Sequence, residues 1–158
     1  MYIPHSVGLI LSVSPKCAST SISNSFHVEG LKPISAEAVA ELKKSFWEVV
    51  GIVRDPIERF ESAYNFFKYG QCGTFPEGSR FGNIESFTDA VLTGLLDDHW
   101  APQSVVLGEC DSYADLESLP IVQRLNACEH REKATYKHKE LEQYYSKDFM
   151  IRGGKWEL

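Results

Sequence analysis

The sequence lacks the features that mark several classes of protein. None of its apolar runs approaches the roughly 20 residues that span a bilayer. A secretory signal has a basic segment before its apolar stretch, and no such segment precedes the apolar stretch near the start of this sequence. Its four cysteines form no Cys-x-x-Cys pair and no Cys/His spacing typical of a metal site. We therefore expect a soluble, cytoplasmic protein with reduced thiols and no metal, and without a membrane partner. In a secreted chain, Cys110 and Cys128 could instead form a disulfide.

Basic residues are also few, since 16 Lys and Arg stand against 22 Asp and Glu, for a net charge of −6. This balance argues against a broad surface for nucleic acid or anionic lipid. The charge is uneven: residues 1–75 hold seven basic and seven acidic side chains, whereas residues 76–110 hold one basic and six acidic, a net −5. A local anion site therefore fits the first half of the chain better than the middle.

What is present indicates one globular domain over residues 1–158, because 43% hydrophobic and 12% aromatic residues can build a core. Two apolar runs, residues 7–13 and 47–53, read as buried strands. Helices are expected over residues 20–26, 36–44, 56–69, 84–96 and 136–147, and short strands over 105–107 and 121–125. This alternation predicts an α/β fold with a central parallel sheet, helices on both sides, and ligands bound at the carboxyl ends of the strands.

A polar turn, SPKCASTS at residues 14–21, connects the first predicted strand to a predicted helix. Backbone N–H groups at such a helix start can face an anion, and Lys16 adds a positive charge. The turn is not a Walker A loop, because GxxxxGK[ST] is absent. On residue types alone, a phosphate-binding turn and an ordinary strand-to-helix loop remain open alternatives.

A second turn places Arg54 directly after the other predicted strand, with Ser62 eight residues later. Asp55 at the cap, Pro56 at the first helical position and Glu58 three residues after the cap predict a well-defined helix start. Arg54 and Ser62 could hold a second phosphate. Alternatively, Arg54 pairs with Asp55 or Glu58 and Ser62 only packs.

Together, the two turns resemble the phosphate-binding motifs of sulfotransferases that use 3′-phosphoadenosine 5′-phosphosulfate (PAPS). The run LSVSPKCASTSI is similar to their 5′-phosphosulfate loop, and VGIVRDPIERFESAYNFF is similar to the 3′-phosphate motif of the carbohydrate sulfotransferases, including the heparan 2-O- and chondroitin types. HWAPQS at residues 99–104 and YYSKDF at residues 144–149 resemble two further segments of that family. The likeness implies a short, soluble form of the P-loop-like sulfotransferase fold.

The resemblance implies that the chain moves a sulfuryl group from PAPS to an acceptor hydroxyl and releases 3′-phosphoadenosine 5′-phosphate (PAP). It implies that Lys16 stabilises the leaving phosphate and that Arg54 and Ser62 bind the 3′-phosphate. The other contacts to the 5′-phosphate would come from the rest of the first turn: Cys17, Ala18, Ser19, Thr20 and Ser21.

Two other basic residues lie in stretches that resemble the family. Arg59 belongs to the second motif, where it either contacts the nucleotide or pairs with helix carboxylates. Arg152 opens a stretch, RGGK, that faintly resembles a 3′-phosphate segment of cytosolic sulfotransferases, and a frayed basic terminus is the plainer interpretation.

A hydroxyl acceptor needs a general base, for which His27, His99, Glu29 and Glu37 are candidates. His27 ranks first, because the heparan 2-O-sulfotransferases that the chain resembles have a His-Val in a comparable place. His99 ranks second, since it follows the acidic pair Asp97 and Asp98.

Two other functions use the same residues. One is a non-catalytic module that binds PAP or another nucleotide, and the other is a small-molecule kinase. The kinase interpretation lacks a Walker A lysine and a carboxylate for Mg²⁺ beside the loop. For a sulfotransferase, the acceptor would be a small molecule or a carbohydrate. The net −5 of residues 76–110 favours a neutral or weakly charged acceptor over a heavily sulfated glycan.

Overall fold

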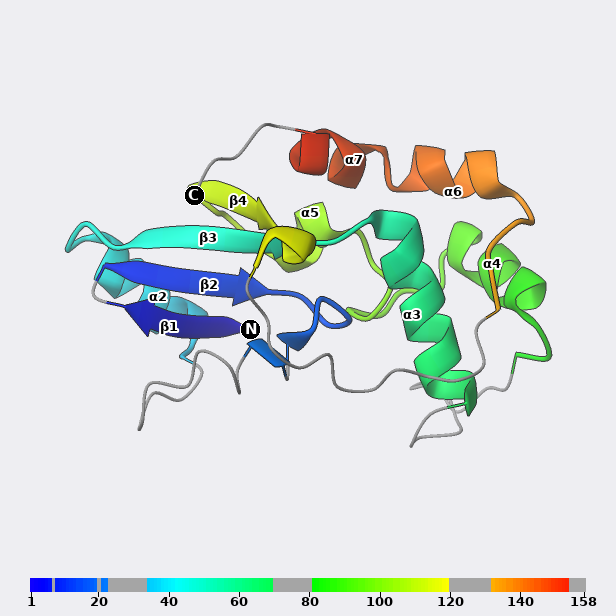
Figure 1. Ribbon diagram of the computed structural model, residues 1–158, viewed down its shortest axis with the longest axis horizontal. Helices are drawn as coiled ribbons and strands as arrows, with labels where there is room; N and C mark the ends of the chain where they lie inside the picture. The colour runs from blue at the N-terminus through cyan, green and yellow to red at the C-terminus, as the bar shows by residue number, and fades with distance from the viewer. Residues whose placement is uncertain (7, 20, 23–33, 70–80, 120–131, 154–158) are drawn as a thin grey trace.

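The computed structural model describes residues 1–6, 8–19, 21–22, 34–69, 81–119 and 132–153 (Figure 1). These residues form an α/β domain in which helices flank a four-stranded mixed sheet. None of the helices in this part of the chain is both long and apolar enough to cross a membrane. The predicted strand over residues 121–125 lies outside the described residues, as do residues 23–26 of the first predicted helix.

The sheet has the strand order β1-β2-β3-β4 and is not wholly parallel. Its strands are β1 (Tyr2–Ser6), β2 (Leu9–Val13), β3 (Glu48–Val53) and β4 (Ser112–Asp115). The three strands β2, β3 and β4 run parallel, whereas β1 pairs antiparallel with β2. The prediction of a parallel sheet is therefore wrong at one edge. Gly8, with a φ of 86°, allows the chain to reverse tightly between β1 and β2.

Three of the predicted helices begin at the predicted residue, and each has a side-chain cap. The helices are α2 (Ala36–Lys43), α3 (Pro56–Tyr69), α4 (Ile84–Leu92), α5 (Gln103–Val106), α6 (His138–Tyr144) and α7 (Ser146–Gly153), with a 3₁₀ turn, η1 (Leu116–Ser118). Ser35 caps α2 and Asn83 caps α4 through their side chains. Asp55 accepts the N–H groups of residues 57 and 58 at the start of α3, both at 3.0 Å. These starts depend on local hydrogen bonds, which is why the sequence predicts them.

Two predicted elements are wrong, and the same part of the fold explains both. Residues 105–107 were expected to form a strand but belong largely to α5, whose first N–H groups, from Gln103 and Ser104, donate to the carboxylate of Asp148. The single helix expected over residues 136–147 is divided into α6 and α7 at Tyr145, whose hydroxyl donates to the carbonyl of Trp100. Asp148, which follows the predicted end of that helix, lies inside α7. Contacts between residues about 45 positions apart therefore decide both elements.

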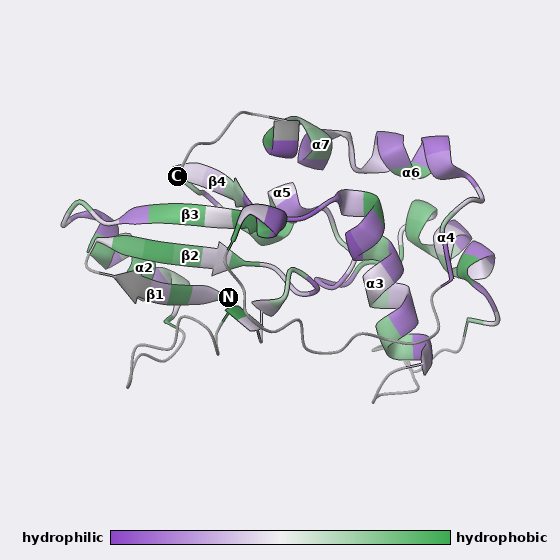
Figure 2. Ribbon diagram, in the orientation of Figure 1, coloured by the Kyte–Doolittle hydropathy of each residue, from purple (hydrophilic) through white to green (hydrophobic). Residues whose placement is uncertain are grey.

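Hydrophobic residues run along β2 and β3, as the colouring in Figure 2 shows, and buried side chains pack on both faces of the sheet. On one face, α2 packs against the central strands through Val39, Ile10 and Val49. On the other face, Leu11 and its neighbours pack with Cys17 and Ile22 of the chain that follows β2. The prediction that helices flank the sheet is thus confirmed for the described residues.

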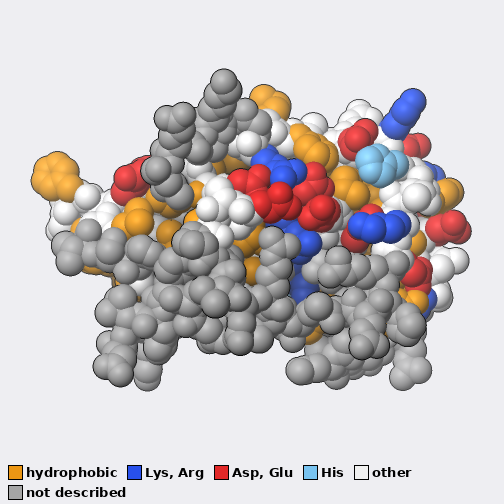
Figure 3. Space-filling model, in the orientation of Figure 1, with side chains coloured by type: hydrophobic (Ala, Val, Ile, Leu, Met, Phe, Trp, Pro, Cys, Tyr) orange, Lys and Arg blue, Asp and Glu red, His pale blue; other side chains and the backbone are white. Residues whose placement is uncertain are grey.

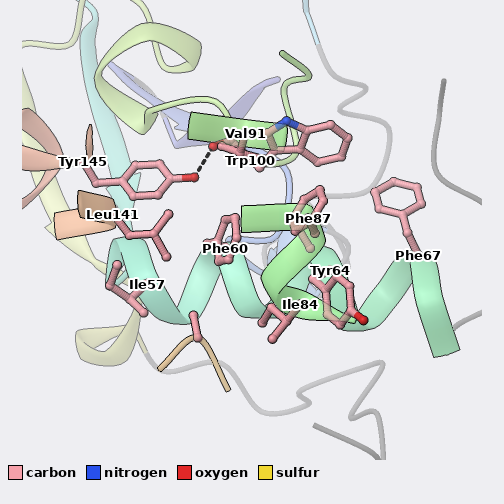
Figure 4. Close-up of a cluster of buried hydrophobic side chains, with 12 residues drawn as sticks. Ile57, Phe60, Tyr64, Phe67, Ile84, Phe87, Val91, Trp100, Leu141 and Tyr145 are labelled. Carbon is pink, nitrogen blue, oxygen red and sulfur yellow. Dashed lines mark hydrogen bonds between the residues drawn. The ribbon is translucent and has the colours of Figure 1, made fainter. Parts of the chain in front are cut away.

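A second layer of helices lies beyond the carboxyl ends of β2 and β3 (Figure 1). Figure 4 shows its core, where Phe60 of α3 stacks on Phe87 of α4 at 5.0 Å between ring centroids. Trp100, Tyr145 and the α6 residue Leu141 complete this buried cluster. Burying each large apolar side chain contributes about 1.5–3 kcal/mol. The aromatic stripe of α3 is therefore core, as its helical spacing predicted, and it anchors α3 beside the sheet.

Candidate functional site

The turn after β2 has an unusual backbone. Lys16 and Ala18 both adopt left-handed conformations, with φ of 65° and 54°, although neither is glycine. Each such residue costs about 1 kcal/mol or more, and strain of this kind concentrates at functional sites. The N–H groups of Ala18 and Ser19 find no acceptor among the described residues. Unpaired N–H groups at a helix start after a left-handed residue form a concavity suited to an anion.

Other predicted residues of this turn have structural roles. The N–H of Cys17 donates to the Ser14 carbonyl at 3.3 Å, so this amide closes the turn. The Cys17 thiol is fully buried, lies 3.1 Å from Ser14 Oγ and donates to Gln103 Oε1. Burial raises the pKa of this thiol, which therefore stays protonated at neutral pH. Ser21 is also buried, and Thr20 lies outside the described residues.

The second predicted turn lies against the first. Arg54, at the end of β3, donates from Nη1 to the carbonyl of Lys16 at 3.3 Å. Its other terminal nitrogen, Nη2, lies 3.4 Å from the carboxylate of Glu58. The structure therefore brings the two predicted phosphate-binding cations together, with one holding the backbone of the other.

One face of α3 connects these cations to Ser62. Glu58, Ser62 and Phe66 follow one another at intervals of four residues, so they share a face and are spaced by about 6 Å along the helix axis. Arg54 contacts the first of them, and Lys16 Nζ lies 3.8 Å from the ring centroid of the last. Ser62, which is half-buried, therefore lies on this face between the two contacts.

Gln103 joins the two turns from a third segment. Its side-chain oxygen accepts the thiol of Cys17 and the N–H of Arg54, and its amide nitrogen donates to the Arg54 carbonyl. The Gln103 N–H in turn donates to Asp148 at 2.7 Å, and both side chains are only 1% exposed. Sequence reasoning pointed to their segments through the family resemblance but missed these two residues, because their hydrogen bonds are all long-range.

Arg59 ties the first turn to the His99 segment. Its guanidinium is 1% exposed and donates to three backbone carbonyls: Pro15 at 2.9 Å, Ala101 at 2.7 Å and Asp98 at 2.6 Å. The expectation that it pairs with helix carboxylates is wrong. Pro15 precedes Lys16, while Asp98 and Ala101 flank His99, so this one side chain sets the spacing of the two segments.

The residues predicted as candidate general bases do not lie together as the two cations do. His99 pairs through Nδ1 with Asp97, whose carboxylate also accepts the His99 backbone N–H, so Asp97 orients the ring. The ring packs edge-on against Phe67, which packs edge-on against Phe66, the ring beneath Lys16. A chain of contacts through two aromatic rings thus connects His99 to Lys16. Glu37 is exposed at the start of α2, and His27 and Glu29 lie outside the described residues.

Arg152 is placed by carboxylates of its own chain. It pairs with Asp55 at 2.8 Å and with Asp115 at 2.6 Å, and Glu117 lies 4.0 Å away. Figure 3 shows acidic side chains grouped with basic ones in the middle of this face. In this arrangement Arg152 joins α7 to the carboxyl ends of β3 and β4. Of the cysteines expected as an alternative disulfide, Cys110 is a free thiol, and Cys128 lies outside the described residues.

Comparison with known proteins found no match to this chain. The chain matches no protein-family model, and no curated protein or solved structure is significantly similar to it. Inference about function therefore depends on the residues and contacts described above.

Proposed function

We propose that the chain is a sulfotransferase that uses PAPS as the donor and an acceptor hydroxyl as the nucleophile. One observation carries the proposal: the four segments that resemble sulfotransferases meet through buried and partly buried hydrogen bonds at the carboxyl ends of β2 and β3. Arg59 and Gln103 make most of these bonds, and Asp148 completes them. Parallel α/β sheets bind their ligands at this edge.

The donor's two phosphate groups have different partners in this proposal. Lys16 and the backbone N–H groups of Ala18 and Ser19 bind the 5′-phosphosulfate, and Arg54 and Ser62 bind the 3′-phosphate. Arg54 and Lys16 are already in contact through the Lys16 carbonyl. A ligand that carries phosphates at both ends of one nucleoside fits two cations held this way.

In the reaction, the acceptor oxygen forms a bond to sulfur as the bond between sulfur and the bridging phosphate oxygen breaks. That phosphate oxygen gains negative charge, which Lys16 and the two N–H groups stabilise. The proton of the acceptor hydroxyl passes to a base. His27 is the first candidate, and His99, oriented by Asp97, is the second.

The acceptor in this proposal is a small alcohol or a neutral or weakly charged sugar. The His99 segment carries the adjacent carboxylates Asp97 and Asp98 and lies within the acidic residues 76–110. A heavily sulfated polymer needs a basic groove, and this segment offers the opposite charge.

The test is transfer of radiolabelled sulfate from PAPS to a panel of small alcohols, neutral sugars and heparin-like polymers. We expect product with the native chain, and loss of most activity in Lys16→Ala and Arg54→Ala. Lys147→Ala, which removes an exposed basic residue from α7, is the matched control and should remain active. Native activity in both site variants would contradict the site assignment.

Thermal-shift measurements separate the alternatives. A larger rise in melting temperature with PAP than with ATP and Mg²⁺ supports the donor site, and the reverse order supports a kinase. Stabilisation by PAP without transfer to any acceptor would identify a binding module.

A further inference from the structure

The guanidinium of Arg54 is shared between two partners of its own chain. Nη1 donates to the carbonyl of Lys16, while Nη2 pairs with Glu58 at 3.4 Å. The first contact positions the Lys16 turn and is compatible with a bound ligand. The second places a carboxylate on the part of Arg54 that remains available to an anion.

Glu58 also lies close to the other residue proposed to bind that anion. It is one helical turn before Ser62 on the same face of α3, a distance of about 6 Å along the axis. A phosphate held between Arg54 and Ser62 therefore comes next to the carboxylate of Glu58. The backbone N–H of Glu58 is already bonded to Asp55, so the side chain can move without disturbing the start of the helix.

The pair between Arg54 and Glu58 is weak enough to exchange. Its distance is long, and the side chains are 24% and 47% exposed. Ion pairs of this kind contribute little to stability because water competes for both charges. A phosphate with two negative charges can displace Glu58 from Arg54, but it then faces a like charge nearby, which opposes binding.

We infer that Glu58 is an internal counter-ion of Arg54 that competes with the 3′-phosphate of the nucleotide. This inference rests on the proposed function, because it assigns a role within the same site. Glu58 holds the guanidinium in place when the site is empty, and it lowers the affinity for PAPS and PAP alike. Competition of this kind favours release of PAP after transfer.

The test compares two nucleotides that differ in the 3′-phosphate. Calorimetric titration of the native chain and Glu58→Gln with PAP and with adenosine 5′-monophosphate isolates the effect of that group. We expect Glu58→Gln to bind PAP about threefold to tenfold more tightly and to bind the monophosphate as the native chain does. Glu58→Asp, which keeps the charge, should bind PAP with an affinity closer to the native one.

The control is Glu85→Gln, which removes an exposed carboxylate from the first turn of another helix, α4. It should leave both affinities unchanged. A native chain that binds PAP, together with a Glu58→Gln variant that binds it equally or more weakly, would overturn the inference alone. Equal tightening for both nucleotides would overturn it too, since it indicates a general charge effect. A native chain that binds neither nucleotide would overturn the proposed function as well.

Discussion

The side-chain amide of Gln103 and the backbone of Arg54 exchange two hydrogen bonds, although the residues lie 49 positions apart. Gln103 Oε1 accepts the Arg54 N–H at 2.9 Å, and Nε2 donates to the Arg54 carbonyl at 2.8 Å. The same oxygen accepts the thiol of Cys17 at 3.1 Å. One buried side chain thus joins the turns that follow β2 and β3, where the proposed donor site lies.

Replacing Gln103 with leucine should destabilise the fold strongly. Leucine has a similar volume but leaves the partly buried Arg54 N–H and carbonyl without their Gln103 partners. An unsatisfied buried group costs about 1–3 kcal/mol, and a partly buried one costs less. We expect the free energy of unfolding to fall by about 2–4 kcal/mol, measured by urea titration. The control is Ser104→Ala, because Ser104 Oγ is buried and has no partner among the described residues. This neighbour should leave stability unchanged or raise it slightly, and equal losses in both variants would contradict the argument.

Arg59 should not tolerate even a conservative change. Lysine keeps the charge, but its ammonium cannot reach the three carbonyls that the guanidinium holds. We expect Arg59→Lys to lower the free energy of unfolding by about 3 kcal/mol, again by urea titration, because buried groups are left unpaired. Lys139→Met, at an exposed position of α6, should change it little. A stable Arg59→Lys variant would show that the three bonds contribute less than their burial indicates.

The sequence predicts those parts of the fold that depend on neighbouring residues. The caps Ser35 and Asp55 place the starts of α2 and α3, and the apolar runs give β2 and β3. The division of α6 from α7 depends instead on contacts with distant residues. Tyr145, for example, turns the chain while its hydroxyl reaches Trp100, 45 positions away. Propensity carries no information about such a partner.

In the candidate site too, the sequence predicts some residues and not others. Motifs identified Lys16, Arg54 and Ser62, and the structure brings them to one face of α3. The residues that hold the site together, above all Gln103 and Arg59, could not be assigned roles from the sequence. Their partners are backbone carbonyls and amides, which every residue offers, so no pattern of side chains reveals them.

Phe46 provides a prediction about local strain. It is 98% exposed and has a φ of 62°, a conformation that costs a side chain about 1 kcal/mol and that glycine adopts freely. Since the ring buries almost nothing, we expect Phe46→Gly to raise the free energy of unfolding by about 0.5–1 kcal/mol in urea titration. Ser45→Gly is the control, because Ser45 lacks a positive φ, and it should lower stability. Destabilisation by both substitutions would show that the ring has a structural role.

The carboxylate of Glu132 should make the free energy of unfolding depend on pH. Burial alone would raise its pKa, but hydrogen bonds from Tyr69, Lys68 and the Ile84 N–H outweigh burial and lower the pKa from 4.5 to about 2. A lowered pKa in the folded state means that the ionised carboxylate stabilises the fold above about pH 4.5. This stability is lost as the pH falls from about 5 to 2.

The expected difference between the native chain and Glu132→Gln is about 1–2 kcal/mol at pH 7, because the carboxylate is 29% exposed and water screens part of the interaction. Unfolding free energies measured between pH 7 and pH 2 should converge for the two proteins. Glu140→Gln, at an exposed position of α6, should follow the native curve. A constant gap across this range would show that Glu132 acts through packing and not through its charge.

The two candidate bases can be separated by kinetics. His99 is held by Asp97 and packs against Phe67, a setting suited to ordering its loop. If His27 is the base, His27→Ala should lower kcat by about 10²–10⁴-fold. His99→Ala should then lower kcat by roughly tenfold or less, through weaker positioning of the loop. Both variants should bind PAP as the native chain does in calorimetry, since neither residue is proposed to contact the 3′-phosphate.

The opposite order of effects, together with an equal loss in Asp97→Asn, would assign the base to His99, because only a catalytic imidazole needs Asp97 to stabilise its protonated form.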